Sequence, residues 1–130
     1  MMRIIIPGTL PGLNEYVHAN RTDPRAGSRM SRDAHVICKL GMLRHAGHRV
    51  KQAYILFKWY EKNRRRDKDN IAFAKKFILD SLQEMGILKN DGWEEVLGFL
   101  DVFEVDKRQP RVEVYLFSAD EADKWKGMAL

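Results

Sequence analysis

Four aspartates between residues 67 and 91 are the side chains of this sequence best suited to chemistry. Asp67 and Asp69 are separated by one residue, and Asp91 lies further along in an Asn-Asp-Gly segment. The fourth, Asp80, falls between them. Carboxylates gathered around one point repel one another and stay ionised only when a cation neutralises their charge. Because oxygen ligands select hard cations, we expect a Mg²⁺ site here, in which Mn²⁺ can substitute.

A metal ion held by these carboxylates would suit phosphodiester hydrolysis. It can bind a phosphate oxygen, activate a water molecule and stabilise the leaving oxygen. A nearby lysine can offset charge in the transition state. On a helical wheel that starts at Asp69, Lys76 and Asp80 fall on one face, opposite the apolar residues. Lys75 points away from the carboxylates, so the wheel favours Lys76 over Lys75 as the lysine of the site.

The same side chains also have a purely structural explanation. Asp67 and Asp69 can cap a helix, where aspartate suits the positive end of the dipole. Asp80 and Lys76 can form an ordinary ion pair four residues apart, and the segment around Asp91 can be only a turn. Spacing alone does not favour the metal site, because an isolated Asp-x-Asp is common and structural roles account for most instances.

Hydrophobic patterning predicts the elements that would hold these residues. The apolar start of the chain reads as a strand over residues 1–7, and Asp23-Pro24 as the start of a helix that ends near 46–47. Residues 52–60 are apolar on both faces and rich in aromatic and β-branched side chains, which indicates a central strand. A second helix is expected over 70–85, ending at Gly86, and a shorter helical turn within 13–20.

The rest of the chain completes an α+β (mixed α/β) domain that spans residues 1–130. Residues 96–105 and 111–117 read as strands, and the five residues between them predict an antiparallel hairpin. The tail from Ser118 is expected to form a short helix. The order strand, helix, strand, helix, strand, strand favours a small sheet of about four strands covered by two main helices.

Composition and charge narrow the classes of function. The chain has 130 residues, of which 45% are hydrophobic, and no stretch has the length that a membrane helix needs. Its single cysteine, Cys38, excludes an internal disulfide and favours the reducing cytoplasm. Residues 1–66 carry 14 Lys and Arg against 4 Asp and Glu, a net +10, whereas residues 67–130 carry 9 against 14, a net −5. A basic half suits a polyanionic partner, although it can also be only a solvated face.

Several basic side chains are candidates for contacts with DNA phosphates. Three consecutive arginines, Arg64, Arg65 and Arg66, precede the first aspartate directly. Nucleases need cations near their own carboxylates to offset repulsion of the phosphates. Arginines also recur every three or four residues along the first long helix, and Lys75 and Lys89 lie close to the aspartates in sequence. The helix arginines, for which an exposed face without ligand is the alternative, are Arg21, Arg25, Arg29 and Arg32.

Other residues that can carry chemistry have simpler explanations. His45 and His48 have a spacing that can bind metal, but we expect a surface pair at a helix end. Cys38 and Trp59 are expected in the core. Trp93, beside the Asp91 turn, could act as a wedge in DNA, although packing is the favoured explanation.

The acidic segment resembles the RusA family of Holliday junction resolvases. The resemblance rests on Arg66-Asp67-Lys68-Asp69-Asn70-Ile71, on a lysine followed by Leu79-Asp80-Ser81-Leu82, and on Asn90-Asp91. In that family an Asp-x-Asp-Asn opens a helix with a lysine and a Leu-Asp-x-Leu element, and an acidic turn follows. The joint pattern is more specific than any of its parts.

This resemblance implies roles for individual residues. Asp67 and Asp69 match the first two metal-binding aspartates, Asp91 the catalytic aspartate of the turn and Asp80 the helix aspartate that adds to the cluster. Lys76 matches the catalytic lysine through its spacing to Leu-Asp-x-Leu. The interval from Asp69 to Lys76 is two residues longer than in the family, so Lys75 remains an alternative for the catalytic lysine. Position 90 is Asn where the family often has Asp, and Asn90 is at most a secondary ligand.

The resemblance also implies an activity. Family members are homodimers that use Mg²⁺ to place paired nicks in four-way DNA junctions. We therefore expect a junction-resolving endodeoxyribonuclease. The alternatives are a nuclease that acts on flaps or forks with the same carboxylates and a basic DNA-binding module without catalysis.

Overall fold

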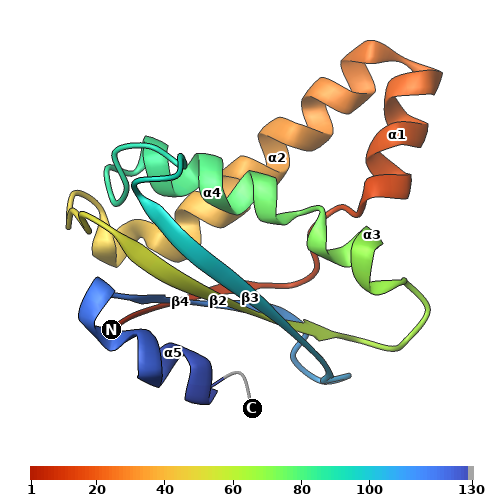
Figure 1. The fold of residues 1–130 in the computed structure, drawn as a ribbon. Coiled ribbons are helices and arrows are strands. Elements are labelled where there is room, and N and C mark those ends of the chain that lie inside the picture. The colour runs from red at the N-terminus through yellow and green to blue at the C-terminus, as the bar shows by residue number, and fades with distance from the viewer. Residues whose placement is uncertain (129–130) are drawn as a thin grey trace.

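A four-stranded mixed sheet organises residues 1–128, the part of the chain that the computed structural model describes. Its strands are β1 (Met2–Pro7), β2 (Ala53–Glu61), β3 (Val96–Val105) and β4 (Arg111–Phe117), in the spatial order β1-β4-β2-β3. Figure 1 shows helices on both sides of this sheet, with most of them on one face. The chain is thus an α+β fold, as predicted.

The apolar strand β2 lies inside the sheet, which confirms the prediction of a central strand. It pairs in parallel with β3, with Phe57 opposite Asp101, and antiparallel with β4, with Phe57 opposite Val114. Its side chains alternate between the two faces, and both faces are covered, so nearly the whole strand is removed from water.

The predicted hairpin of the last two strands is wrong. β2 lies between β3 and β4, so these two strands run antiparallel to each other without pairing. The connection 106–110 passes the end of β2, where the Asp106 N–H donates to the Glu61 carbonyl at 2.8 Å. A connection of five residues can either close a hairpin or cross the end of one intervening strand. The apolar β2 lies between β3 and β4 because it has two faces to bury.

The long helix of the chain begins directly after Asp23, which confirms the predicted helix start. The Asp23 carboxylate accepts a hydrogen bond from the Arg25 N–H at 3.0 Å and caps α2 (Pro24–Met42). A short 3₁₀ turn, Leu43–His45, continues α2, and the chain turns at Gly47 with φ of 76°. The preceding helix α1 (Leu13–Thr22) is longer than the helical turn expected there.

The second predicted helix is divided in two, α3 (Lys68–Ala72) and α4 (Lys75–Glu84). At the break the N–H groups of Ala74, Lys76 and Phe77 bond to the carbonyls three residues earlier instead of four. A single helical wheel therefore does not relate Asp69 to Lys76 and Asp80. The helix ends as predicted at Gly86, whose φ is 70°.

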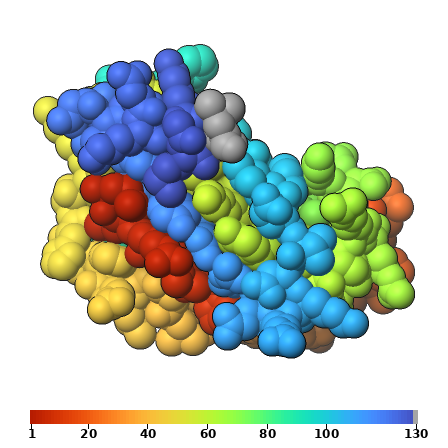
Figure 2. Space-filling model, turned by 90° about the horizontal axis from the view of Figure 1, so that it is seen from below, coloured from red at the N-terminus to blue at the C-terminus, as the bar shows by residue number. Residues whose placement is uncertain are grey.

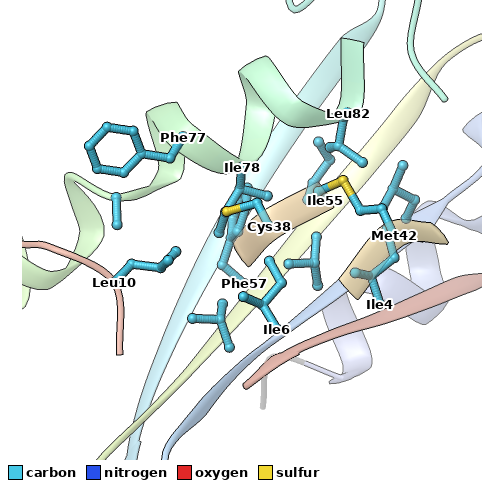
Figure 3. Packing of buried hydrophobic residues seen from close by; sticks show 14 of the residues in the cluster. Ile4, Ile6, Leu10, Cys38, Met42, Ile55, Phe57, Phe77, Ile78 and Leu82 are labelled. Carbon is cyan, nitrogen blue, oxygen red and sulfur yellow. The ribbon is translucent and has the colours of Figure 1, made fainter. Parts of the chain in front are cut away.

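The main core fills the space between the sheet and the helices α2 and α4 (Figure 3). Cys38 is fully buried within it, as predicted, and burial raises the pKa of its thiol to about 12. On the other face, α5 (Ala122–Met128) places Trp125 against Leu56 and Phe117, and Figure 2 shows this helix lying over the strands. Within residues 1–128, no helix has the length and apolar character needed to cross a membrane.

Candidate functional site

A cavity of about 610 Å³ opens where β2 and β3 end, and it contains the first two predicted metal ligands. Asp67 comes from the connection after β2 and Asp69 from the first turn of α3. β3 contributes Phe103 and Glu104 to the lining of the same cavity. Because β2 and β3 are parallel, their carboxyl ends meet at one edge of the sheet and bring these segments together.

The carboxylates of Asp67 and Asp69 are exposed and have no protein partner within residues 1–128. Asp67 occupies the N-cap position of α3, with φ of −68° and ψ of 155°, but its side chain makes no capping hydrogen bond. Neither carboxylate forms a hydrogen bond or an ion pair with another described residue. Helix capping by these side chains, the structural alternative, is thus not what the structure shows.

The guanidinium of Arg66, by contrast, is fully engaged inside the protein. It donates to both carboxylate oxygens of Glu61 at 2.9 Å, to Glu15 at 3.0 Å and to the Leu10 carbonyl at 3.0 Å. Burial opposes its charge, but the hydrogen bonds and charges of Glu61 and Glu15 outweigh that effect and raise the pKa of Arg66. Arg66 therefore holds the chain that immediately precedes Asp67 and is not free for a phosphate.

Asn70 fixes the other side of the aspartate pair. Its side-chain oxygen accepts a hydrogen bond from the Asn14 N–H at 2.8 Å, which ties α3 to the start of α1. Gly12 permits this approach, because a Cβ there would lie 2.6 Å from the same oxygen. Arg66 and Asn70 thus anchor the segment that carries Asp67 and Asp69 from both ends.

The other two predicted metal ligands lie elsewhere. Asp80 is on α4, where its carboxylate is 3.4 Å from His35 Nε2. Asp91 precedes β3 and is exposed, and its N–H bonds to the side chain of Asn90 at 2.9 Å. It therefore lies at the opposite end of the β2–β3 pair from Asp67, and nine strand residues span roughly 26–30 Å.

The predicted cluster of four aspartates is therefore not assembled within one chain. Among residues 1–128, no three histidine, cysteine, aspartate or glutamate side chains lie close enough together to hold a metal ion. The expected position of Asp80 beside Asp69 failed because the wheel assumed an unbroken helix. The chain itself brings only Asp67 and Asp69 together.

The two candidate lysines have different surroundings. Lys75 is mostly buried, and its ammonium lies 2.7 Å from Asp101 and 3.8 Å from the centre of the Phe99 ring. Asp101 also accepts a hydrogen bond from the Trp59 indole at 2.8 Å. Lys75 thus joins α4 to the sheet. Lys76 is exposed on α4, and neither lysine lines the cavity with Asp67.

The remaining basic candidates lie at three places on the surface. Arg64 lines the cavity, and Arg65 is exposed beside it. Arg25, Arg29 and Arg32 share one exposed face of α2, as predicted, around a shallow hollow of about 440 Å³. Arg21, which was expected on the same helix, lies on α1 instead, because the chain breaks its helix at Asp23. Lys89 is exposed near the Asp91 end, next to Arg49 and Lys51.

Trp93 contradicts the prediction that it packs in the protein. Its side chain is 98% exposed, on the loop between α4 and β3. Trp59 lies in the core, as predicted, and His45 bonds to the Arg3 carbonyl at 3.1 Å at the end of α2.

Two acidic residues of the cavity were not found by the sequence analysis. Glu61 ends β2 and Glu104 lies near the end of β3, and both line the cavity with Asp67. Only the parallel register of β2 and β3 brings them together, and the predicted hairpin concealed it.

Neither a protein-family model nor a curated protein sequence matches this chain. The resemblance to the RusA family therefore stays a prediction.

Proposed function

We propose that this protein is a Mg²⁺-dependent, structure-selective endodeoxyribonuclease with a RusA-like fold that resolves four-way DNA junctions by paired nicks. One observation carries the proposal. The exposed carboxylates of Asp67 and Asp69, without protein partners within residues 1–128, share a cavity with Arg64. Two carboxylates and a guanidinium that have no partner among the described residues suit a metal ion and a phosphate together.

The donor set of the cavity fits magnesium. Proteins hold Mg²⁺ through one or two carboxylates, with waters and substrate phosphates completing the octahedron. Asp67 and Asp69 supply two carboxylates in an open site, which also suits Mn²⁺. When bound, the ion would supply Lewis-acid stabilisation of the phosphate and an activated water.

The residues of the chain would position the DNA. Arg64 and Arg65 would contact the phosphates at the cavity, and the α2 arginines would form a second, separate contact area. Because a four-way junction presents several duplex arms, two basic areas can contact different arms. Arg66 supports this arrangement indirectly, by holding the backbone that leads to Asp67.

A homodimer is part of the proposal, since two symmetric nicks require two sites related by a two-fold axis. Asp91 lies too far from Asp67 to join it within one chain, so it can complete the site only from a partner copy. Asp80, in contact with His35, is left out of the metal set. We assign the role of the site lysine to Lys76, because Lys75 is engaged by Asp101. We place the protein in the cytoplasm, where its single thiol stays reduced.

A labelled synthetic junction tests the proposal. We expect paired nicks in the presence of Mg²⁺ and none without a divalent ion. Asp67→Asn and Asp69→Asn should retain junction binding and lose more activity than the roughly 10- to 100-fold that follows from losing an outer-shell partner. Asp123→Asn, an exposed aspartate on α5, is the matched control and should cut normally.

The same assay separates the alternatives. Equal cutting of flaps, forks and junctions would favour a nuclease of broader specificity, and equal cutting of linear duplex would contradict the proposal. A second function has one observation in its favour, the absence of a three-ligand cluster among residues 1–128. A DNA-binding module of that kind would bind junctions without turnover in any metal.

A further inference from the structure

Lys68 lies in the cavity that contains the two exposed aspartates. It stands between Asp67 and Asp69 in sequence, at the first position of α3, and its side chain lines the cavity with theirs. Lys75 and Lys76 are on α4 and do not line it. Neither the helical wheel nor the resemblance points to Lys68, because both place the lysine of the site further along the chain.

The ammonium of Lys68 is oriented by the protein without being neutralised. It lies 5.8 Å from the centre of the Phe103 ring, which lines the same cavity from β3. A ring face attracts a cation but leaves its charge and its N–H donors available. Lys68 forms no hydrogen bond or ion pair with another of residues 1–128, whereas the charge of Lys75 is balanced by Asp101. Lys68 is thus able to bind an anion in the cavity.

The charges of the cavity suit one phosphate group when a divalent ion is present. Glu61 and Arg66 form an ion pair and balance each other. The other charged side chains of the lining, three carboxylates and two cations, are Asp67, Asp69, Glu104, Arg64 and Lys68. A divalent ion changes their excess of one negative charge into an excess of one positive charge, which matches the single negative charge of a phosphodiester. Without Lys68 the cavity and its ion together are neutral and have no net attraction for a phosphate.

We propose that Lys68 binds the DNA phosphate in this cavity, beside the carboxylates of its own chain, and that Phe103 is a positioning residue for its ammonium. The ammonium donates hydrogen bonds to a nonbridging oxygen of the phosphate, where negative charge is greatest. The inference rests on the proposed function and adds a second lysine to that site. Lys76 reaches the DNA from outside the cavity, and Lys68 from within it.

A single phosphodiester tests the inference without any cleavage. The probe is thymidylyl(3′–5′)thymidine, Mn²⁺ is the ion, and electron paramagnetic resonance measures the unbound Mn²⁺. In the parent chain we expect the probe to tighten Mn²⁺ binding at least about fivefold, which is the lower range of coupling between two sites. The methylphosphonate analogue of the probe, which carries no charge, should leave Mn²⁺ binding unchanged.

Substitution of Lys68 should affect the two ligands in opposite directions. We expect Lys68→Gln to abolish the effect of the probe and to tighten the binding of Mn²⁺ alone by about twofold to fivefold, because an exposed ammonium near two carboxylates opposes the ion weakly. Lys68→Arg keeps the charge and should keep the coupling. Lys62→Gln removes the same charge from an exposed lysine outside the cavity and should behave like the parent.

A second pair of variants tests the positioning by the ring. Phe103→Leu keeps an apolar side chain against the core but removes the ring face under the ammonium. The effect of the probe should therefore fall to an intermediate value, while the binding of Mn²⁺ alone stays as in the parent. Phe99→Leu, on the same strand but outside the cavity, is the control and should keep the full effect. Equal coupling in the two variants would overturn the role of Phe103.

The outcomes distinguish this inference from the proposed function. A parent chain that binds no Mn²⁺ contradicts the proposed function, and the inference falls with it. Mn²⁺ binding that the probe does not change, or coupling that survives in Lys68→Gln, overturns the inference alone. Weaker binding of Mn²⁺ by Lys68→Gln also overturns it, because Lys68 then supports the carboxylates or the fold and not the phosphate.

Discussion

Arg66 determines at the scale of a single residue how the aspartate pair is held. It belongs to a triple arginine that the sequence offers as a DNA contact, yet Arg64 and Arg65 differ from it in having no side-chain hydrogen bond or ion pair with any of residues 1–128. Arg66 differs from its two neighbours because it bonds to Glu61 and Glu15. These two glutamates lie at the end of β2 and near the start of α1, which the fold brings together at this point. Three identical neighbours in sequence therefore divide into one structural residue and two surface residues.

Removal of this guanidinium should destabilise the fold. Arg66→Gln leaves Glu61 buried without a counter-charge, and we expect a loss of roughly 2 kcal/mol, below the 3–5 kcal/mol of a fully buried pair because the pair is partly exposed. Urea denaturation measures the change. Arg65→Gln is the control and should stay within about 0.5 kcal/mol of the parent, as exposed substitutions do.

The carboxylate of Glu113 makes the stability of the fold depend on pH in the acid range. Burial on β4 acts to raise its pKa, but hydrogen bonds from Tyr115 and Arg111 and the charges of Arg111 and Arg3 outweigh burial and lower the pKa from its ordinary 4.5. The stabilisation is present above pH 4.5 and is lost as pH falls through the lowered pKa. In urea titrations across this range, Glu113→Gln should be less stable at neutral pH and should lose less on acidification, whereas an unchanged acid slope would contradict the assignment.

The sequence predicted single residues well where one property decides their place. Cys38 and Trp59 are in the core because they are apolar in apolar elements, and Asp23 caps α2 because the following proline fixes the helix start. The prediction that Trp93 packs within the protein was wrong. Nothing in its sequence neighbourhood distinguishes a buried indole from one that protrudes, since that depends on how the loop leaves α4.

At the scale of elements, the break between α3 and α4 changed the candidate site. The hydrophobic period continues through both helices, so the sequence indicates one helix over 70–85. Asn70 is tied to α1, and Phe73 packs on Tyr16, whereas α4 follows the sheet. These tertiary contacts override the local pattern, and they separate Asp80 from Asp69.

The break also turns Lys75, and not Lys76, towards the sheet. Lys75→Met leaves Asp101 without its ammonium partner, although Trp59 still donates to it, and should cost roughly 1–3 kcal/mol of stability. Lys76→Met should leave stability within about 0.5 kcal/mol of the parent. Thermal and urea unfolding of the two neighbours provides the comparison, and equal losses would show that the Lys75 contact contributes nothing.

β3 and β4 show where local sequence stops being informative. Both strands were predicted with the residues that they have in the structure, but their pairing was not. A five-residue connection fits either topology, and the choice depends on which strand needs two buried faces. The same choice decides which carboxylates line the cavity, because the parallel β2 and β3 bring Glu104 to Asp67.

At the scale of the whole molecule, the distance between Asp67 and Asp91 makes the proposed activity a property of two chains. A mixing experiment tests this. Asp67→Asn and Asp91→Asn should each be inactive, but a mixture forms heterodimers in which one of the two sites keeps both native carboxylates. We expect single nicks to return on mixing, measured with a labelled junction.

Two controls define this result. Asp67→Asn mixed with Asp69→Asn should stay inactive, because both changes fall on the same side of each shared site. Recovery in that mixture, or none with Asp91→Asn, would mean that the carboxylates do not act across the dimer.

The burial of Cys38 has a practical consequence for such experiments. A thiol with a pKa of about 12, shielded by the core, forms almost no thiolate near neutral pH and should not react with maleimides in the native protein. Any cysteine introduced on the surface then becomes the reactive one. Crosslinkers and spin labels can therefore be placed without removing the native residue, and the slow modification of Cys38 reports how often the core opens.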